Sequence, residues 1–340
     1  MAAFSTSSSR PYHIIIFGAS GFTGQFVVEE VARTASEGPK GNLKWAVAGR
    51  NRTKLEKVVE QAAGALSKPE LKSEVDILIA DVSDPDSLAA MCKQAVIVLS
   101  CVGPYRFFGE PVVKSCVESG THCIDISGEP QFLESMQLNY NDQAAEKGVY
   151  IVGSCGFDSI PADMGVIYTR DQFKAVESFL TASSGPEVQY GAYAGVGGIS
   201  NVFKLIFAGL MFFFLVKFNF GRNLLKKFPE FFSFGFFSKA GPTRKQMEGS
   251  SFSFIFLGEG YTEGTDPSEG KPNGKIRTLV KGPEAGYVAT PIAMVQAALT
   301  MLNEPDSLPK TGGVYTPGAT FAKTTLINRL NKHGIQFSVL

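Results

Sequence analysis

The sequence predicts an α/β protein built on a Rossmann-type, doubly wound parallel sheet. Apolar runs alternate with amphipathic stretches throughout residues 12–154. Runs of four to eight apolar residues are typical of parallel strands, which are covered on both faces. The stretch "HIIIFGASGFTGQFVVEE", residues 13–30, adds a strand, a glycine-rich turn and a helix in the order found in dinucleotide-binding proteins.

The first half of the chain is expected to supply the parallel sheet and its crossover helices. Six strands are predicted, at residues 12–18, 44–49, 75–80, 95–103, 122–127 and 149–154. The amphipathic stretches between them predict helices at residues 52–66, 87–94, 110–120 and 130–148. Since right-handed crossovers connect parallel strands, helices are expected on both faces of the sheet.

After Asp163 the pattern changes to that of an antiparallel sheet. Alternating runs predict strands at 175–185, 188–195, 251–264 and 274–282, with a turn at 265–274 and closing helices at 290–303 and 321–334. A chain of 340 residues exceeds the roughly 250–300 residues of a single core, which favours two domains. The expected organisation is a flexible leader at 1–11, a Rossmann domain at 12–163, a second α+β domain of the substrate or oligomerisation type at 164–284, and a helical region at 285–340.

The composition argues against several classes of partner. The 32 basic residues balance the 32 acidic ones, so a nucleic acid is a poor candidate partner. The cysteines form no CxxC pair and only three histidines are present, so no metal site is expected. The cysteines are read as reduced, mostly buried thiols, and the N-terminus lacks the apolar core of a secretory signal. An intracellular protein that is not secreted is predicted.

The glycine turn, which we define as residues 18–24, is the strongest functional signal. Gly18 suits a tight turn after the strand, Gly21 lets the backbone approach a pyrophosphate, and Gly24 lets the helix pack on the strand. The N–H groups and the dipole of the following helix attract phosphate. The predicted cofactor contacts here are Gly18, Ser20, Gly21, Phe22, Thr23 and Gly24. The alternative is a glycine-rich turn that binds no ligand.

Four further cofactor residues are predicted where the next strands end. Arg50 follows the second strand, where NAD enzymes usually carry an acidic residue for the ribose 2′-hydroxyl. Because a guanidinium suits a 2′-phosphate, NADP is preferred over NAD; the alternative is a solvated surface charge. Asp81 is expected either to accept a hydrogen bond from the adenine amino group or to cap the next helix. Gly103 and Pro104 are expected to form a wall beside the nicotinamide.

The sequence assigns no catalytic residue. The Tyr-x-x-x-Lys pair of short-chain dehydrogenases is absent, and His13, His122 and His333 are expected to be structural. An acid for the substrate heteroatom is usual in hydride transfer. The acidic or phenolic side chains expected near the cofactor are Tyr105, Asp125, Glu129 and Asp158. Helix capping or loop hydrogen bonding is the favoured role for each.

A phenylalanine-rich segment at 203–237 holds 13 of the 28 phenylalanines. Its apolar stretch, 205–216, lies between Lys204 and Lys217. As a helix this stretch rises about 18 Å, short of the ~30 Å hydrocarbon core. We favour a monotopic hairpin in a lipid interface over a buried helix pair covering the second domain's sheet, and over a transmembrane span.

Several motifs together resemble the saccharopine dehydrogenase-like oxidoreductases and, more distantly, the saccharopine reductases and the trans-acting enoyl reductases. The resemblance extends over almost the whole chain and is carried by "GASGFTGQFV", "AVAGRN", "VGPYRFFGEPVVKSC", "CIDISGE", "GFDSIPADMGV" and "KGPEAGYVATPIAMVQAALTML". It implies a Rossmann domain, an NAD(P)-type cofactor, a second α/β domain and association with lipid droplets, mitochondria and membranes. It does not imply the saccharopine reaction.

The expected function is an NADP-preferring oxidoreductase that acts on a lipid-like substrate at a membrane or lipid-droplet surface. A homodimer is a further expectation. Similar proteins have a longer stretch between residues 184–187 and the segment that begins at Val188, so the second domain is expected to be shortened here. The alternative function is therefore a nucleotide-binding scaffold at a lipid surface, without turnover.

Overall fold

The computed structural model describes residues 10–172, 191, 198–235, 238, 241–260 and 270–340. The chain divides into two compact units. One comprises Met1–Ser178 with Ser250–Leu340, and the other comprises Phe179–Gly249. This division groups the strands after Ser250 with the Rossmann unit, whereas the predicted second domain spans 164–284; the predicted borders stay a prediction.

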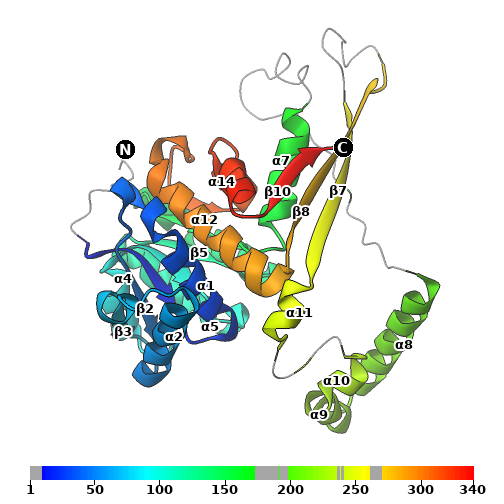
Figure 1. Ribbon diagram of the computed structural model, residues 1–340, viewed down its shortest axis with the longest axis horizontal. Helices are drawn as coiled ribbons and strands as arrows, with labels where there is room; N and C mark the ends of the chain where they lie inside the picture. The colour runs from blue at the N-terminus through cyan, green and yellow to red at the C-terminus, as the bar shows by residue number, and fades with distance from the viewer. Residues whose placement is uncertain (1–9, 173–190, 192–197, 236–237, 239–240, 261–269) are drawn as a thin grey trace. The chain divides into compact units, whose positions relative to one another are not determined.

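The first unit contains a seven-stranded sheet with the order β3-β2-β1-β4-β5-β6-β9 (Figure 1). Its strands are β1 (Tyr12–Phe17), β2 (Trp45–Gly49), β3 (Asp76–Ile79), β4 (Ala95–Ser100), β5 (His122–Asp125), β6 (Tyr150–Val152) and β9 (Gly313–Tyr315). Every neighbouring pair is parallel. The first six strands have the order of a Rossmann fold, which confirms the predicted doubly wound sheet. The short strand β9 extends it and was not predicted.

Alternate residues of β1 enter different hydrophobic cores, one on each face of the sheet. Ile14 and Ile16 belong to one core, and Ile15 and Phe17 to the other. The helices over the first core are α1 (Phe22–Thr34), α2 (Arg52–Ala65) and α12 (Thr290–Asn303). Those over the second core are α4 (Pro85–Cys92), α5 (Tyr105–Ser119) and α6 (Pro130–Glu146). Burial on both faces explains why the strands read as continuous apolar runs.

Most predicted helices occur within a few residues of their expected bounds, and two differ. Helix α5 begins at Tyr105 rather than residue 110, because the Glu129 carboxylate accepts hydrogen bonds from its first N–H groups. The single helix predicted at 321–334 is wrong. The chain forms α13 (Pro317–Phe321) and α14 (Leu326–Lys332), and between them the Thr324 hydroxyl donates to the carbonyl of Phe321. Such local side-chain bonds compete with helix continuation.

A three-stranded antiparallel sheet completes the first unit. It has the order β10-β8-β7, with β7 (Ser251–Gly260), β8 (Gly274–Pro283) and β10 (Gln336–Val339). The predicted pairing of the strands at 251–264 and 274–282 is confirmed, although residues 261–269 lie outside the described residues. Helix α7 (Ile160–Asp171) packs against this sheet. A Cβ added at its Gly165 would lie 2.2 Å from the ring of Phe256. The strands predicted at 175–185 and 188–195 lie outside the described residues, except for Gly191.

The remaining short elements of the first unit connect these larger ones. They are α3 (Leu71–Glu74), the 3₁₀ turns η1 (Ala35–Glu37), η2 (Pro39–Gly41) and η5 (Pro305–Ser307), and the π-helical turn η4 (Ala285–Ala289). Arg10, in the predicted leader, donates hydrogen bonds to the carbonyls of Cys92 and Ser119. The leader is therefore fixed to the domain at its last residues.

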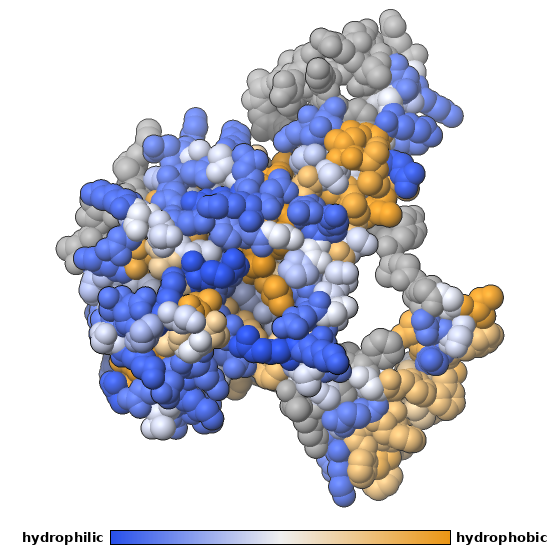
Figure 2. Space-filling model, in the orientation of Figure 1, coloured by the Kyte–Doolittle hydropathy of each residue, from blue (hydrophilic) through white to orange (hydrophobic). Residues whose placement is uncertain are grey.

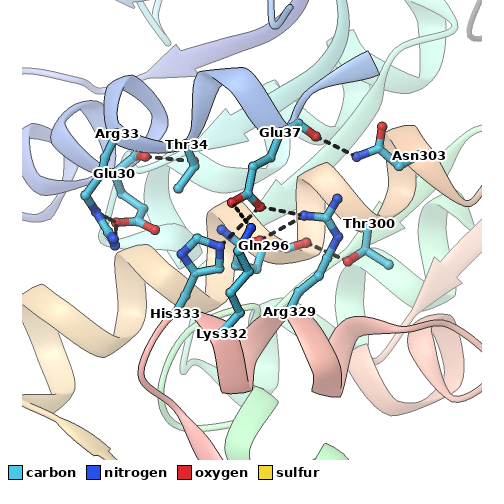
Figure 3. Close-up of polar contacts among 10 residues, drawn as sticks. All are labelled: Glu30, Arg33, Thr34, Glu37, Gln296, Thr300, Asn303, Arg329, Lys332 and His333. Carbon is cyan, nitrogen blue, oxygen red and sulfur yellow. Dashed lines mark hydrogen bonds and ion pairs between the residues drawn. The ribbon is translucent and has the colours of Figure 1, made fainter. Parts of the chain in front are cut away.

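The Glu37 cluster joins the C-terminal helices to the Rossmann core (Figure 3). The Glu37 carboxylate accepts from Arg329 Nη1 at 3.1 Å and from Lys332 Nζ at 2.6 Å, and lies 3.1 Å from His333 Nε2. Asn303 Nδ2 donates to the Glu37 carbonyl at 2.9 Å. Burial raises the pKa of Glu37, but the hydrogen bonds from Lys332 and His333 outweigh it, and the pKa is lowered overall. Charge pairing therefore holds α14 against the turn after α1.

The second unit is helical in its described residues. It contains α8 (Ile199–Leu215), α9 (Asn219–Lys227), α10 (Pro229–Phe232) and α11 (Arg244–Glu248). No residue of α8 is buried within its own unit, and the choice between a buried helix pair and a lipid-interface hairpin stays a prediction. At 17 residues α8 is about 25 Å long, which is shorter than the hydrocarbon core.

One described helical stretch, Ala285–Asn303, is long and apolar enough to cross a membrane. It contains η4 and α12, and 78% of the 18-residue apolar window within it is buried in the protein. Every residue from Thr290 to Leu302 is buried. Its hydrophobicity is therefore that of a core helix covering the sheet.

Glu37→Gln tests the cluster. The substitution should lower the free energy of unfolding at neutral pH by roughly 1–3 kcal/mol, because it removes a partly buried charge from three basic partners. The folded-state pKa of Glu37 lies below its ordinary 4.5, so its contribution is complete above that pH and is lost as the pH falls through the folded value. Denaturant unfolding should therefore show wild type and variant converging in acid. A difference that stays constant with pH would contradict the assigned ion pairing.

Candidate cofactor site

The candidate site lies along the carboxyl edge of the parallel sheet, where the strand order reverses. Strand β1 pairs with β2 on one side and with β4 on the other. The N–H of Cys101, just after β4, donates to the Phe17 carbonyl at 2.8 Å. Open α/β sheets bind ligands in the crevice at such a reversal point. The ten predicted cofactor residues follow β1, β2, β3 and β4, so the fold brings all of them to one edge.

The three glycines of the glycine turn each meet a steric requirement. Gly18 has φ +84°, and a Cβ added there would lie 2.8 Å from Val102 Cγ2. The Gly21 N–H donates to the Gly18 carbonyl at 2.8 Å, which closes the turn. A Cβ added at Gly24 would lie 2.2 Å from that same carbonyl oxygen. The spacing is therefore enforced by contacts within the protein.

The start of α1 presents unused hydrogen-bond donors. Gly21 is the N-cap residue, and no side chain caps the helix, so the N–H groups of residues 22–24 have no intrahelical acceptor. The hydroxyls of Ser20 and Thr23 bond to no other residue in the part of the chain that the structure describes. Together with the helix dipole, these groups form the donor set that suits a diphosphate.

The Phe22 side chain makes a contact that the sequence did not predict. Its ring packs edge-on against Tyr287 of η4, with centroids 4.7 Å apart, and Phe26 lies 5.7 Å from the same tyrosine. The ring of Phe22 thus anchors the turn to the C-terminal part of the chain. Its backbone N–H still belongs to the donor set at the helix start.

Arg50 and Asp81 face each other across the ends of β2 and β3. Arg50 Nε lies 3.9 Å from Asp81 Oδ2, and the arginine side chain is 74% exposed. Asp81 Oδ1 accepts from the N–H and hydroxyl of Ser83, at 3.0 and 2.8 Å. These bonds, with a smaller contribution from Arg50, lower the pKa of Asp81. Asp84, rather than Asp81, caps α4. The exposed guanidinium is accessible to a phosphate.

Gly103 and Pro104 lie on the other side of β1. Both are exposed, and Pro104 is the N-cap residue of α5. A Cβ added at Gly103 would lie no closer than 3.6 Å to any other atom, so a side chain there would not clash with the protein. The pair offers backbone and a pyrrolidine ring, without a polar side chain, to the crevice.

Two of the four candidate acids serve the start of α5. The Tyr105 hydroxyl donates to the Ser100 carbonyl at 2.8 Å and accepts from the Ile126 N–H at 3.4 Å. Burial and the nearby Asp125 raise the pKa of Tyr105 well above its ordinary value. Glu129 accepts from the N–H groups of Tyr105 and Arg106, at 2.8 and 2.9 Å. These are the capping and loop-supporting roles expected from the sequence.

The other two candidates differ in exposure. Asp125 is 3% exposed, and its Oδ1 accepts from the N–H groups of Ser127 and Ser154, at 2.9 and 3.0 Å. Burial raises the pKa of Asp125, while the Ser127 and Ser154 bonds oppose that rise. Asp158 is exposed, and its Oδ2 lies 3.5 Å from the Cβ position of Gly128. Among the four, Asp158 is the carboxylate most accessible to a substrate.

The histidines and cysteines near the sheet have structural surroundings. His13 Nδ1 accepts from the Lys44 N–H, and His122 Nδ1 from the Tyr150 N–H. Burial lowers the pKa of His122 to about 3 and raises that of the Cys101 thiol to about 12. All five cysteines are free, and no group of three or more His, Cys, Asp or Glu in the described ranges could hold a metal ion.

A Rossmann sheet with an amide-lined glycine turn at its reversal point defines the class of dinucleotide-binding domains. The family model of the saccharopine dehydrogenase NADP binding domain matches residues 14–152. The human saccharopine dehydrogenase-like oxidoreductase is 51% identical, over 98% of both chains. The chain belongs to this family of saccharopine dehydrogenase-like oxidoreductases.

More distant relatives carry informative names. A Caenorhabditis elegans protein named "Lipid droplet localized protein" is 34% identical over 96% of this chain and 98% of its own length. An Arabidopsis thaliana protein named "Probable mitochondrial saccharopine dehydrogenase-like oxidoreductase" is 34% identical over 97% of this chain and 96% of its own length. The enoyl reductase resemblance is partial: a Mycobacterium tuberculosis protein so named matches at 38% identity over 47% of this chain and 36% of its own.

The alignment with the human protein reveals an internal difference in length. It runs over 422 positions, whereas this chain has 340 residues, so at least 82 aligned positions have no counterpart here. This agrees with the expectation of a shortened chain. The expected junction, Glu187–Val188, lies outside the described residues.

Gly24→Ala tests whether the glycine turn depends on helix–strand contact. The added methyl overlaps the Gly18 carbonyl, so the free energy of unfolding should fall by roughly 1–3 kcal/mol and dinucleotide affinity should fall with it. Gly64→Ala is the matched control, because that helical glycine has no atom within 4 Å of its Cβ position. The control should be neutral or stabilising by up to ~1 kcal/mol. Equal melting temperatures and affinities for the two variants would refute the steric role of Gly24.

Proposed function

We propose that the protein is an NADP-dependent oxidoreductase that acts on a lipid-like substrate at a membrane or lipid-droplet surface. The observation that carries the proposal is the unused donor set at the start of α1, located at the carboxyl ends of the paired strands β1 and β4. Amides in this position bind the linked phosphates of a dinucleotide. The match to an NADP-binding family model over residues 14–152 supports the same cofactor class.

The preference for NADP over NAD rests on Arg50. Its guanidinium follows β2 and is largely exposed, so it can form charge-assisted bonds to a 2′-phosphate. Asp81 is positioned to orient Arg50 through the contact at 3.9 Å. Because the Asp81 carboxylate also accepts from Ser83, it keeps its place when the arginine moves toward a ligand.

The residues around the nicotinamide position would orient the cofactor rather than react with it. A bound nicotinamide would supply or accept the hydride. Gly103 and Pro104 would give the ring a wall without a side-chain nucleophile, and the buried Asp125 would hold the loops after β5 and β6 in place. Asp158 is the exposed carboxylate available to a substrate at this edge, and its role as an acid is part of the proposal.

The lipid-surface part of the proposal rests on α8. Its phenylalanines at 212–214 are 56–60% exposed, and apolar surface on this scale is typical of an interaction site. The names of the worm and plant relatives support a lipid-droplet or mitochondrial location. The homodimer expected from the sequence stays a prediction.

A catalytically inactive, nucleotide-binding scaffold at a lipid surface is the second candidate. Two observations favour it. The side chains of Tyr105, Glu129 and Asp125 form structural hydrogen bonds. In addition, at least 82 positions of the alignment with the human relative have no residue in this chain. Cofactor binding requires only the glycine turn and Arg50. Turnover requires a substrate site as well.

Arg50→Glu should weaken NADPH binding by roughly 10- to 100-fold, the value of a charge-assisted contact, while NADH affinity changes little. Fluorescence titration of the purified protein with each reduced cofactor measures both constants. Arg52→Gln is the control, since Arg52 Nη2 is directed at the Ile77 carbonyl, 3.4 Å away. If NADPH affinity fell for Arg52→Gln and not for Arg50→Glu, the assignment would move to Arg52.

Adding lipid to the NADPH-bound protein distinguishes the enzyme function from the scaffold function. NADPH-loaded protein should show a decay of reduced-nicotinamide absorbance once membrane lipid extract is added, if an apolar substrate in that extract is reduced. The Gly24→Ala variant, which should bind NADPH poorly, controls for oxidation that does not need the glycine turn. Stable absorbance in the presence of bound NADPH and extracts from several membranes would favour the scaffold.

A further inference from the structure

The second unit carries a strong local excess of positive charge beside its apolar surface. Between Gly198 and Gly235 there are five lysine and arginine residues and one acidic residue, whereas the whole chain is balanced. Lys204 lies in the second turn of α8, Lys217 lies just after α8, and Lys226 and Lys227 lie in the last turn of α9. All four are exposed. Figure 2 shows apolar side chains over much of the surface of α8–α10.

Helix α8 lacks the polar stripe of a helix that lies on a protein core. From Leu205 to Leu215 every residue is apolar, and residues 205, 206, 207 and 210 are 54–55% exposed. A helix that is hydrophobic on all sides requires an apolar environment. The hydrocarbon layer of a lipid surface supplies one to a helix too short to span it.

The corner between α8 and α9 is fixed by two contacts. A Cβ added at Gly221 would lie 2.1 Å from the Leu215 carbonyl oxygen, so only glycine allows α9 to cross the end of α8 this closely. Arg222 Nη1 donates to the Val216 carbonyl at 2.6 Å and its guanidinium also contacts Asn219, so this cation serves the corner itself. Lys217 Nζ lies 4.0 Å from the Phe213 ring centroid. The corner thus holds the Lys217 ammonium group beside the apolar end of α8.

We propose that the α8–α9 corner is a preformed anchor for anionic phospholipid surfaces, in which α8 enters the apolar layer and Lys217, Lys226 and Lys227 meet the charged headgroups. This inference rests on one part of the proposed function, namely that the protein binds a lipid surface. The new element is that the protein prefers lipid surfaces with negatively charged headgroups. Lysines beside a membrane-inserted apolar segment strengthen binding to a negatively charged lipid surface by electrostatic attraction, and salt screens this attraction.

Vesicle flotation of the full-length protein tests the proposal. Wild type should partition more strongly onto phosphatidylcholine vesicles that contain phosphatidylserine than onto phosphatidylcholine alone, and the difference should shrink as salt is raised. Lys226→Gln with Lys227→Gln should reduce partition on the anionic vesicles by roughly 25-fold, about fivefold for each lysine, and leave partition on the neutral vesicles unchanged. Lys226→Arg with Lys227→Arg keeps the charge and should bind like wild type.

The matched control is Lys310→Gln with Lys323→Gln, two exposed lysines of the first unit, which should partition like wild type. A second arm compares Gly221→Ala, which should open the corner and weaken anionic binding, with Gly209→Ala in α8, where no atom lies within 4 Å of the added Cβ. Equal flotation with both vesicle types would overturn the inference and leave the proposed lipid-surface function standing. Flotation with neither type would overturn both.

Discussion

The carbonyl oxygen of Gly18 is the point on which the candidate site depends. It accepts the N–H of Gly21 at 2.8 Å, and the Cβ position of Gly24 lies 2.2 Å away from it, so α1 packs on the end of β1 with no room for a methyl group. This close approach directs the first N–H groups of α1 to the edge between β1 and β4. A larger residue at either position would move the helix axis, and the donors would no longer converge. The donor geometry that the proposed diphosphate site requires is therefore set by backbone packing rather than by a charged side chain.

The same edge explains why no catalytic acid is evident. Polar side chains join the loops after β4, β5 and β6. Tyr105 links the end of β4 to the loop after β5, Asp125 links the loops after β5 and β6, and the Glu129 carboxylate accepts from the first N–H groups of α5. Moving the Asp125 carboxylate would leave the buried N–H groups of Ser127 and Ser154 without this acceptor, which is costly. These side chains are thus committed to shaping the crevice. A group that exchanges protons with a substrate has to be exposed, as Asp158 is.

Local patterns in the sequence were sufficient for the parallel sheet, the glycine turn and most helices, because burial on both faces of each strand leaves a direct record in apolar runs. They were insufficient where a contact joins distant residues. Strand β9 has three residues and β10 has four, too few for a periodic signal, and both are defined by their partners. Glu37 meets Arg329 across 292 positions, and Phe22 meets Tyr287 from the other end of the chain. A charged or aromatic residue does not by itself indicate which distant residue it will contact.

The phenylalanine-rich segment poses a different problem. Sequence and structure agree that it forms an apolar helix, but no described residue buries that helix. In α12 every residue from Thr290 to Leu302 is buried, so a run of apolar residues is satisfied by the sheet beneath it. In α8 no residue is buried, although its composition is more apolar still. Since hydrophobic surface is stable only when removed from water, α8 requires an environment that the described residues do not supply. The proposed lipid surface would supply hydrocarbon to α8, and polar or negative groups to Lys217 just after α8 and to the lysines in the last turn of α9.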